Sequence, residues 1–103
     1  MATKDITASE VNEQMIADWK KKFDGVFKYE TEDGKVGYFR MPDRKILGMS
    51  TTAPDNVAGN EIIANNCFLA GDRIILEDDK YFFGLSKELP KYIKIQTGKS
   101  TEL

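Results

Sequence analysis

The chain has 103 residues, of which 41% are hydrophobic and 31% charged, so it is long enough for one domain and too short for two. Its formal net charge is −2 and its pI about 5.2, which argues against a general nucleic-acid binder with a basic face. The sequence contains no histidine, which excludes Ser-His-Asp and Cys-His catalytic sites and Cys/His zinc sites. An enzyme would have to rely on carboxylates, Lys or Tyr, and measurable turnover would reveal it. We expect instead no enzyme activity, no cofactor and no metal.

The cysteine count and the N-terminal residues indicate the compartment. Cys67 is the single cysteine, so an intrachain disulfide cannot form and a reducing compartment fits best. The segment MATKDITASE lacks the apolar stretch of a signal peptide, and no apolar run approaches the roughly 18 residues that span a bilayer. These features predict a cytoplasmic protein with no membrane partner.

Residues 1–6 form a polar lead, and a helix is predicted from about residue 8 to 23. Thr7 and Glu10 have the spacing of a capping box, and Gly25 is a natural stop. Three cations crowd the last turn, where they suit the helix dipole. The apolar stripe recurs at every fourth residue, at Val11, Met15, Trp19 and Phe23.

Two extended runs follow, at residues 26–31 and 36–41. Asp33-Gly34 between them predicts a two-residue hairpin turn, in which both positions need positive φ. The alternation along the first run places Phe27 and Tyr29 on one face. Because a lone hairpin is marginal, it must pack on the first helix or pair with a further strand.

A second and a third helix are predicted next. Pro42 suits the first position of the second helix, and Pro54 ends it. The third helix runs near residues 57–70, with Gly71 as its stop.

A fourth helix is predicted from Asp78 or Asp79, either of which can cap it, to about Leu89, where Pro90 breaks it. Residues 72–77 before it read as a short strand or an extended link. Residues 92–95 after it either add a short strand or extend the helix.

The sequence thus predicts a single α+β domain over residues 7–95: an N-terminal helix, a β-hairpin, three helices and an optional short C-terminal strand. Residues 96–103 are expected to form a mobile tail. The expected core comprises Val11, Met15, Trp19, Phe23, Phe27, Ile46, Ile62, Ile63, Cys67, Leu69, Phe82 and Leu85.

Three patterns that could hold a ligand are better explained without one. Gly98-Lys99-Ser100 resembles the end of a phosphate-binding loop, but Ile93 stands where that motif needs glycine. The acidic residues 77–79 with Asp72 lack the alternating spacing of a calcium loop, and we expect them to cap a helix. Cys67 has no histidine to activate it and should behave as a small hydrophobic residue.

A basic face is a further alternative. Arg40, Arg44, Lys45 and residues 20–22 could gather near Tyr29 and Tyr38 and bind single-stranded nucleic acid by charge and stacking. The negative net charge of the chain favours instead a solvated rim or a surface for a protein partner.

The central block resembles a family of small phage proteins, the tail assembly chaperones and related structural-module proteins. The pieces that carry the resemblance are Tyr38-Phe39-Arg40, Pro42-Asp43-Arg44, Asn60-Glu61, Asn66-Cys67, Gly71-Asp72, Asp78-Asp79 and Tyr81-Phe82-Phe83.

The resemblance implies a non-enzymatic phage assembly protein in the host cytoplasm. Such a protein binds a tape-measure or other phage structural protein and keeps its apolar segments soluble. One alternative is an auxiliary capsid protein or other virion structural protein, which would place the chain in the virion. Another is a small anti-defence protein that binds a host factor or nucleic acid. Self-association into a homo-oligomer is also open.

Helix caps and helix ends explain the prolines, glycines and acidic pair of the central block, but they do not explain one further set of residues. We expect these residues to mark a surface for a protein partner: Arg40, Arg44, Tyr81, Phe82 and Phe83.

Overall fold

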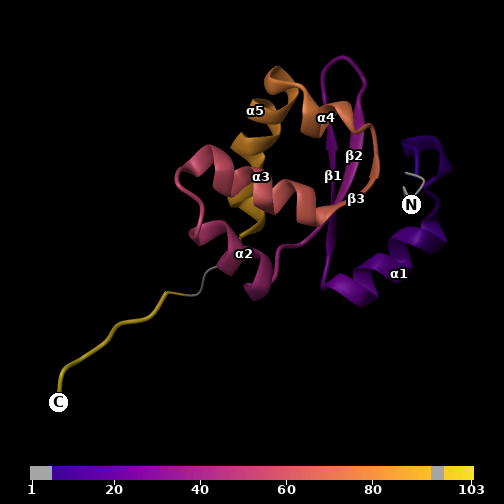
Figure 1. Ribbon diagram of the computed structural model, residues 1–103. Helices are drawn as coiled ribbons and strands as arrows, with labels where there is room; N and C mark the ends of the chain where they lie inside the picture. The colour runs from indigo at the N-terminus through magenta and orange to yellow at the C-terminus, as the bar shows by residue number, and fades with distance from the viewer. Residues whose placement is uncertain (1–5, 94–96) are drawn as a thin grey trace, which may run out of the picture.

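The computed structural model describes residues 6–93 and 97–103, and it confirms the α+β class (Figure 1). The elements in chain order are the 3₁₀-helix η1 (Ala8–Glu10), α1 (Glu13–Phe23), β1 (Val26–Glu30), β2 (Val36–Arg40), α2 (Arg44–Thr51), α3 (Asn56–Cys67), β3 (Phe68–Gly71), α4 (Ile74–Glu77), α5 (Asp79–Glu88) and the 3₁₀-helix η2 (Leu89–Tyr92).

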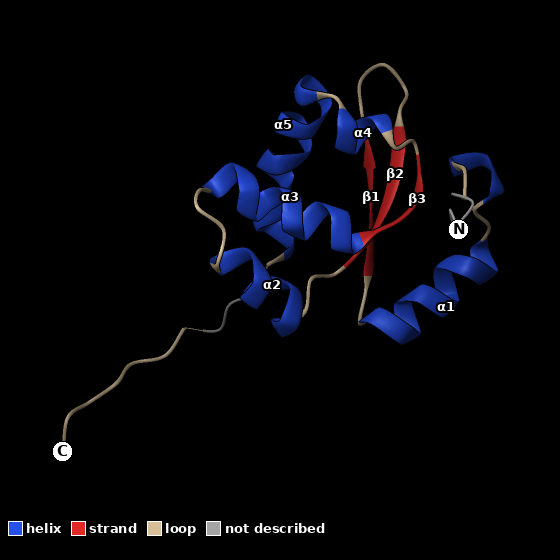
Figure 2. Ribbon diagram, in the orientation of Figure 1, coloured by secondary structure: helices blue, strands red, loops and turns tan. Residues whose placement is uncertain are grey.

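The three strands form one antiparallel sheet in the order β1-β2-β3. Helices α2 to α5 lie on one side of this sheet and α1 lies on the other (Figure 2). Phe27 stands opposite Phe39, and Gly37 stands opposite Gly71. The side chains of one strand alternate between the two faces, so each face meets different helices.

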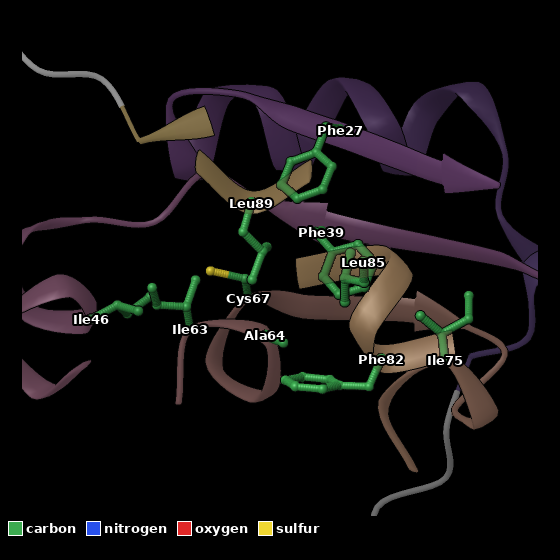
Figure 3. Packing of buried hydrophobic residues seen from close by; sticks show 10 residues of the cluster. All are labelled: Phe27, Phe39, Ile46, Ile63, Ala64, Cys67, Ile75, Phe82, Leu85 and Leu89. Carbon is green, nitrogen blue, oxygen red and sulfur yellow. The ribbon is translucent and has the colours of Figure 1, made fainter. Parts of the chain in front are cut away.

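The core fills the face covered by α2 to α5 (Figure 3). Phe39 of the central strand is 0% exposed. Its ring stacks on Phe27 at 5.2 Å between centroids and meets Phe68 edge-on at 5.6 Å. The buried cluster is Phe27, Phe39, Ile46, Ile63, Ala64, Cys67, Ile75, Phe82, Leu85 and Leu89.

The first helix begins later than the sequence predicted. Thr7 makes no side-chain bond to a backbone N–H, because its hydroxyl donates to the Glu10 carboxylate at 3.0 Å. Only the short η1 forms there. Asn12 is the N-cap of α1, and its side chain accepts from the Met15 N–H at 2.9 Å. The prediction of one helix from about residue 8 to 23 is therefore wrong at its start, since α1 begins at Glu13. Its predicted end at Phe23 is confirmed.

The predicted place of α1 in the core is also wrong, since none of its residues is buried. Trp19 lies on Tyr38 with ring centroids 6.2 Å apart. Tyr38 points to the outer face of the sheet, where α1 is the only described α-helix and no described segment covers α1 in turn. Val11, Met15, Trp19 and Phe23 are consequently half-buried, as are Ile62 and Leu69. The remaining six predicted core residues are confirmed: Phe27, Ile46, Ile63, Cys67, Phe82 and Leu85.

The predicted hairpin is confirmed within one residue at each strand, but its turn is longer. Three residues, 32–34, separate Thr31 from Lys35, whose backbone atoms bond at 2.8 Å. Gly34 has φ of 93°, whereas Asp33 has no positive φ. The two-residue turn is thus corrected to a three-residue loop, in which one glycine supplies the left-handed position.

The second helix starts at Arg44 and not at Pro42. The Asp43 carboxylate accepts from the Ile46 N–H at 2.9 Å, so aspartate provides the N-cap and proline precedes it. The helix ends at Thr51, before Pro54.

The third helix ends at Cys67, and the last residues of its predicted range form β3 instead. Gly71 explains the change. Its φ is +119°, and a Cβ atom there would lie 2.2 Å from the Val36 carbonyl oxygen. The absence of a side chain allows the backbone to approach β2 and pair with it.

The segment predicted as a strand or link at residues 72–77 contains the short helix α4, so that interpretation is wrong. The fourth predicted helix is confirmed as α5, with the Asp78 carboxylate accepting from the Lys80 N–H at 3.0 Å. After it, η2 extends the helical path through Pro90 to Tyr92. The optional strand falls partly on residues 94–96, outside the described residues.

The two faces of the sheet should differ in their contribution to stability. Phe39→Ala should lower the free energy of unfolding by about 3–5 kcal/mol, because it empties a fully buried site. Trp19→Ala should cost about 1–2 kcal/mol, because Trp19 buries only part of its area. Urea denaturation measures both, and Phe83→Ala, at an exposed position, serves as the control. A larger loss for Trp19→Ala than for Phe39→Ala would contradict this placement of the core.

Candidate partner-binding site

The five residues predicted as a partner surface do not form one patch. Arg40 ends β2 and Arg44 begins α2, so these two lie near each other in the chain. Tyr81 bonds to Asp33 in the hairpin turn, at the opposite end of β2. Phe82 belongs to the core, at 6% exposure, and its side chain is not available to a partner. Phe83 is 51% exposed on α5.

Arg40 has a structural role that the sequence did not reveal. Its guanidinium donates to the Asp43 carboxylate at 2.9 Å and lies 4.4 Å from the centre of the Phe23 ring. The side chain is only 20% exposed. Arg40 therefore connects the end of α1 to the start of α2.

Arg44 lines a groove where the end of β2 and α2 meet η2, which we call the Arg44 groove. Its volume is about 600 Å³, within the range of natural ligand sites. Much of the wall is apolar, and the wall at Gly48 carries no side chain, where a Cβ atom would meet nothing within 4 Å. The lining residues are Asp24, Met41, Pro42, Asp43, Arg44, Leu47, Gly48, Thr51 and Tyr92.

Two charged residues at the start of α2, Asp43 and Arg44, differ in whether other described residues of the chain pair with them. The Ile46 N–H, followed by the Arg40 guanidinium, holds the pKa of Asp43 below its ordinary value. Asp43 is thus an ionised cap with its partners in place. Arg44 makes no ion pair with any residue in the described part of the chain. The groove therefore offers an apolar wall and, beside the carboxylates of Asp24 and Asp43, a guanidinium that can donate to an external carboxylate.

Tyr81 holds the hairpin turn against α5. Its hydroxyl donates to the Asp33 carboxylate, which also accepts from the Thr31 hydroxyl. The Thr31 bond, and after it the Tyr81 bond, lowers the pKa of Asp33. The same contact raises the pKa of Tyr81. This predicted site residue thus connects two elements of the fold.

A second groove of about 600 Å³ lies between the hairpin and α5. Tyr29 lies against Gly84, where an added Cβ atom would be 2.7 Å from the tyrosine hydroxyl. Burial, with a smaller contribution from the Glu88 carboxylate, raises the pKa of Tyr29. The groove is lined by Tyr29, Glu30, Thr31, Glu32, Asp33, Lys80, Tyr81, Gly84, Lys87 and Glu88.

The patterns considered for ligands have mainly structural roles. Asp78 caps α5 as expected, whereas Asp72 accepts from the Val36 N–H at 2.9 Å and supports the sheet. Cys67 is buried, and this burial raises the pKa of its thiol to about 11. Within residues 6–93 and 97–103, no group of three or more His, Cys, Asp or Glu could hold a metal ion.

The two tyrosines expected beside the basic face lie on opposite faces of the sheet, whereas Lys22 and Arg40 do come together at the Phe23 ring. Tyr38 meets Trp19 on the outer face, whereas Tyr29 lies against Gly84 of α5 on the core face. No helix in the described ranges is long and apolar enough to cross a membrane.

Sequence reasoning found Arg44 but missed the groove around it. Tyr92 comes from η2 and Leu47 from α2, and only the folded chain brings them together. Asp43 is a good N-cap residue, and it stands three residues before Ile46, from whose N–H it accepts a hydrogen bond. This local signal could have placed Arg44 at the start of a helix.

Comparison with known proteins yields no relative: no family model, no curated protein and no solved structure matches this chain at a significant level. The function must therefore be argued from its own residues.

The Tyr81–Asp33 contact predicts a measurable titration. The pKa of Asp33 should lie below its ordinary value and should rise in Tyr81→Phe, which lacks the donor. Because a carboxyl with a depressed pKa stabilises the fold only while ionised, this contribution should be lost as the pH falls through the pKa of the folded state. Side-chain NMR of Asp33 measures the shift, with Tyr38→Phe as the control. An equal pKa in wild type and Tyr81→Phe would disprove the contact.

Proposed function

We propose that this chain is a non-enzymatic phage assembly protein that binds other phage proteins, in the manner of a tail assembly chaperone. Its partner would be a tape-measure protein or another phage structural protein. The Arg44 groove would receive an apolar segment of that partner. The observation that carries the proposal is the combination of an apolar wall with a cation that lacks an ion pair among the described residues.

The shape of the groove supports a protein segment as its occupant. Met41, Leu47 and Tyr92 supply apolar surface to a cavity of about 600 Å³. Arg44 can pair with a carboxylate that follows such a segment, and this pairing would fix the direction of binding. Exposed apolar area framed by charge is typical of interaction sites.

The resemblance to the chaperone family supports the proposal from a second side. Its Pro42-Asp43-Arg44 piece contains the N-cap and the first residue of α2, and all three residues line the groove. The same piece includes Asp43, which pairs with Arg40 of the preceding element. One of the seven pieces that carry the resemblance therefore lines the proposed binding site.

The virion structural protein remains the second candidate. A chain that stays in the particle would use its exposed apolar residues in permanent contacts. Met49, Val57, Ile74 and Phe83 are exposed large hydrophobic residues that could serve this purpose.

A pull-down with charge variants tests the proposal. The tagged chain is recovered from infected cells, and bound proteins are identified by mass spectrometry. Wild type should recover a tape-measure or tail-tube protein. Arg44→Glu should reduce this recovery about tenfold, because a carboxylate of the partner would meet a like charge. Lys45→Glu, the same charge change at an exposed neighbour that does not line the groove, should leave recovery unchanged.

Several outcomes would overturn the assignment. Equal recovery with Arg44→Glu would remove the groove as the binding site. Presence of the chain in purified virions would favour the structural protein. Binding of single-stranded DNA that weakens steeply with salt would favour a nucleic-acid function.

A further inference from the structure

The outer edge of β1 presents backbone groups without partners in the described ranges. Thr31 bonds to Lys35, and the Gly25 carbonyl accepts from Met41, so the odd-numbered residues of β1 face β2. Because an antiparallel ladder alternates, the N–H and C=O groups of residues 26, 28 and 30 point away from the sheet. Among residues 6–93 and 97–103, no backbone or side-chain hydrogen bond reaches these groups.

The two edges of the sheet differ in this respect. At the β3 edge, the Gly71 N–H donates to the Ile6 carbonyl at 2.8 Å, so the N-terminal segment covers part of it. No described segment makes such a bond to β1. An open strand edge is a template on which another strand can pair.

The side chains at the β1 edge carry complementary charges. Lys28 and Glu30 lie on the same face, 3.8 Å apart, with 51% and 58% of their side chains exposed. Each strand therefore presents one cation and one anion two residues apart. A second copy of β1, running antiparallel, presents the same two charges in reverse order.

The charges distinguish the registers of such a pairing. If Lys28 stands opposite Lys28 of the second copy, like charges meet. If Val26 stands opposite Lys28, Glu30 comes opposite Asp24, and like charges meet again. If Lys28 stands opposite Glu30, the two-fold symmetry creates two ion pairs, with the two Tyr29 residues adjacent at the axis.

The groove between the hairpin and α5 lies along this same edge, since Tyr29, Glu30 and Thr31 line it. Tyr29 of each copy would lie on the core face, beside the groove of its own copy. The edge thus offers backbone groups unpaired within the described ranges and side chains that can form two ion pairs.

We propose that the chain forms a symmetric dimer through antiparallel pairing of the two β1 edges, with Lys28 of each copy opposite Glu30 of the other. The two three-stranded sheets then join into one continuous sheet of six strands. This dimer does not depend on the proposed chaperone function. A lysine on an edge strand can also serve to discourage pairing, and the charge variants below distinguish the two roles.

The test uses sedimentation velocity of the full chain over a range of concentrations. Wild type should show a reversible monomer–dimer equilibrium. Lys28→Glu and Glu30→Lys each place like charges at both ion pairs, and each should raise the dissociation constant about tenfold. An equimolar mixture of the two variants should dimerise like wild type, because every acidic side chain again faces a basic one.

Glu61→Lys makes the same charge change at an exposed position on α3 and should leave the dimer unchanged. Circular dichroism confirms that each variant is folded. Three results would overturn the proposal: a wild type that stays monomeric at every concentration, single variants that dimerise as tightly as wild type, or a mixture that does not restore dimerisation. If Lys28 instead discourages pairing, Lys28→Glu would not weaken association.

Discussion

The close approach of β3 to β2 at Gly71 is the constraint on which the rest of the structure depends. A side chain at this position would collide with the Val36 carbonyl oxygen and with Gly37. Because the collision is avoided, Asp72 can bond to both the N–H and the carbonyl of Val36, and the Gly71 N–H can hold Ile6. The hairpin thereby gains the third strand that an isolated hairpin needs for stability.

This strand pairing determines what each face of the sheet can do. With β3 in place, α3 ends against the sheet and α4 and α5 return over the same face, so Phe39 becomes fully enclosed. The helix α1 remains alone on the outer face. Arg40 connects its end to α2, which brings Arg44 to the wall of the groove. With β3 on one side of β2, β1 forms the other edge of the sheet.

The sequence predicted elements that are defined by local chemistry. The hairpin and α5 follow from Gly34, Asp78 and Pro90, which act within a few residues of their positions. It could not predict β3, because residues 68–70 continue an apolar helical pattern and only their contact with β2 ends it. The candidate site was only partly predictable, because it too depends on contacts between residues that are distant in the chain. Arg44 was identified, whereas Phe82 is a core residue and Tyr92 reaches the groove from η2.

The stability of Gly71→Ala tests the central constraint most directly. The substitution places a Cβ atom against backbone and demands a φ of +119° from a residue that rarely adopts it. Urea denaturation should show a loss of more than about 2 kcal/mol, or no folded state. Gly48→Ala is the matched control, since its Cβ atom meets nothing within 4 Å, and it should gain about 0.5–1 kcal/mol from helix propensity. A Gly71→Ala protein as stable as wild type would contradict the role of this contact.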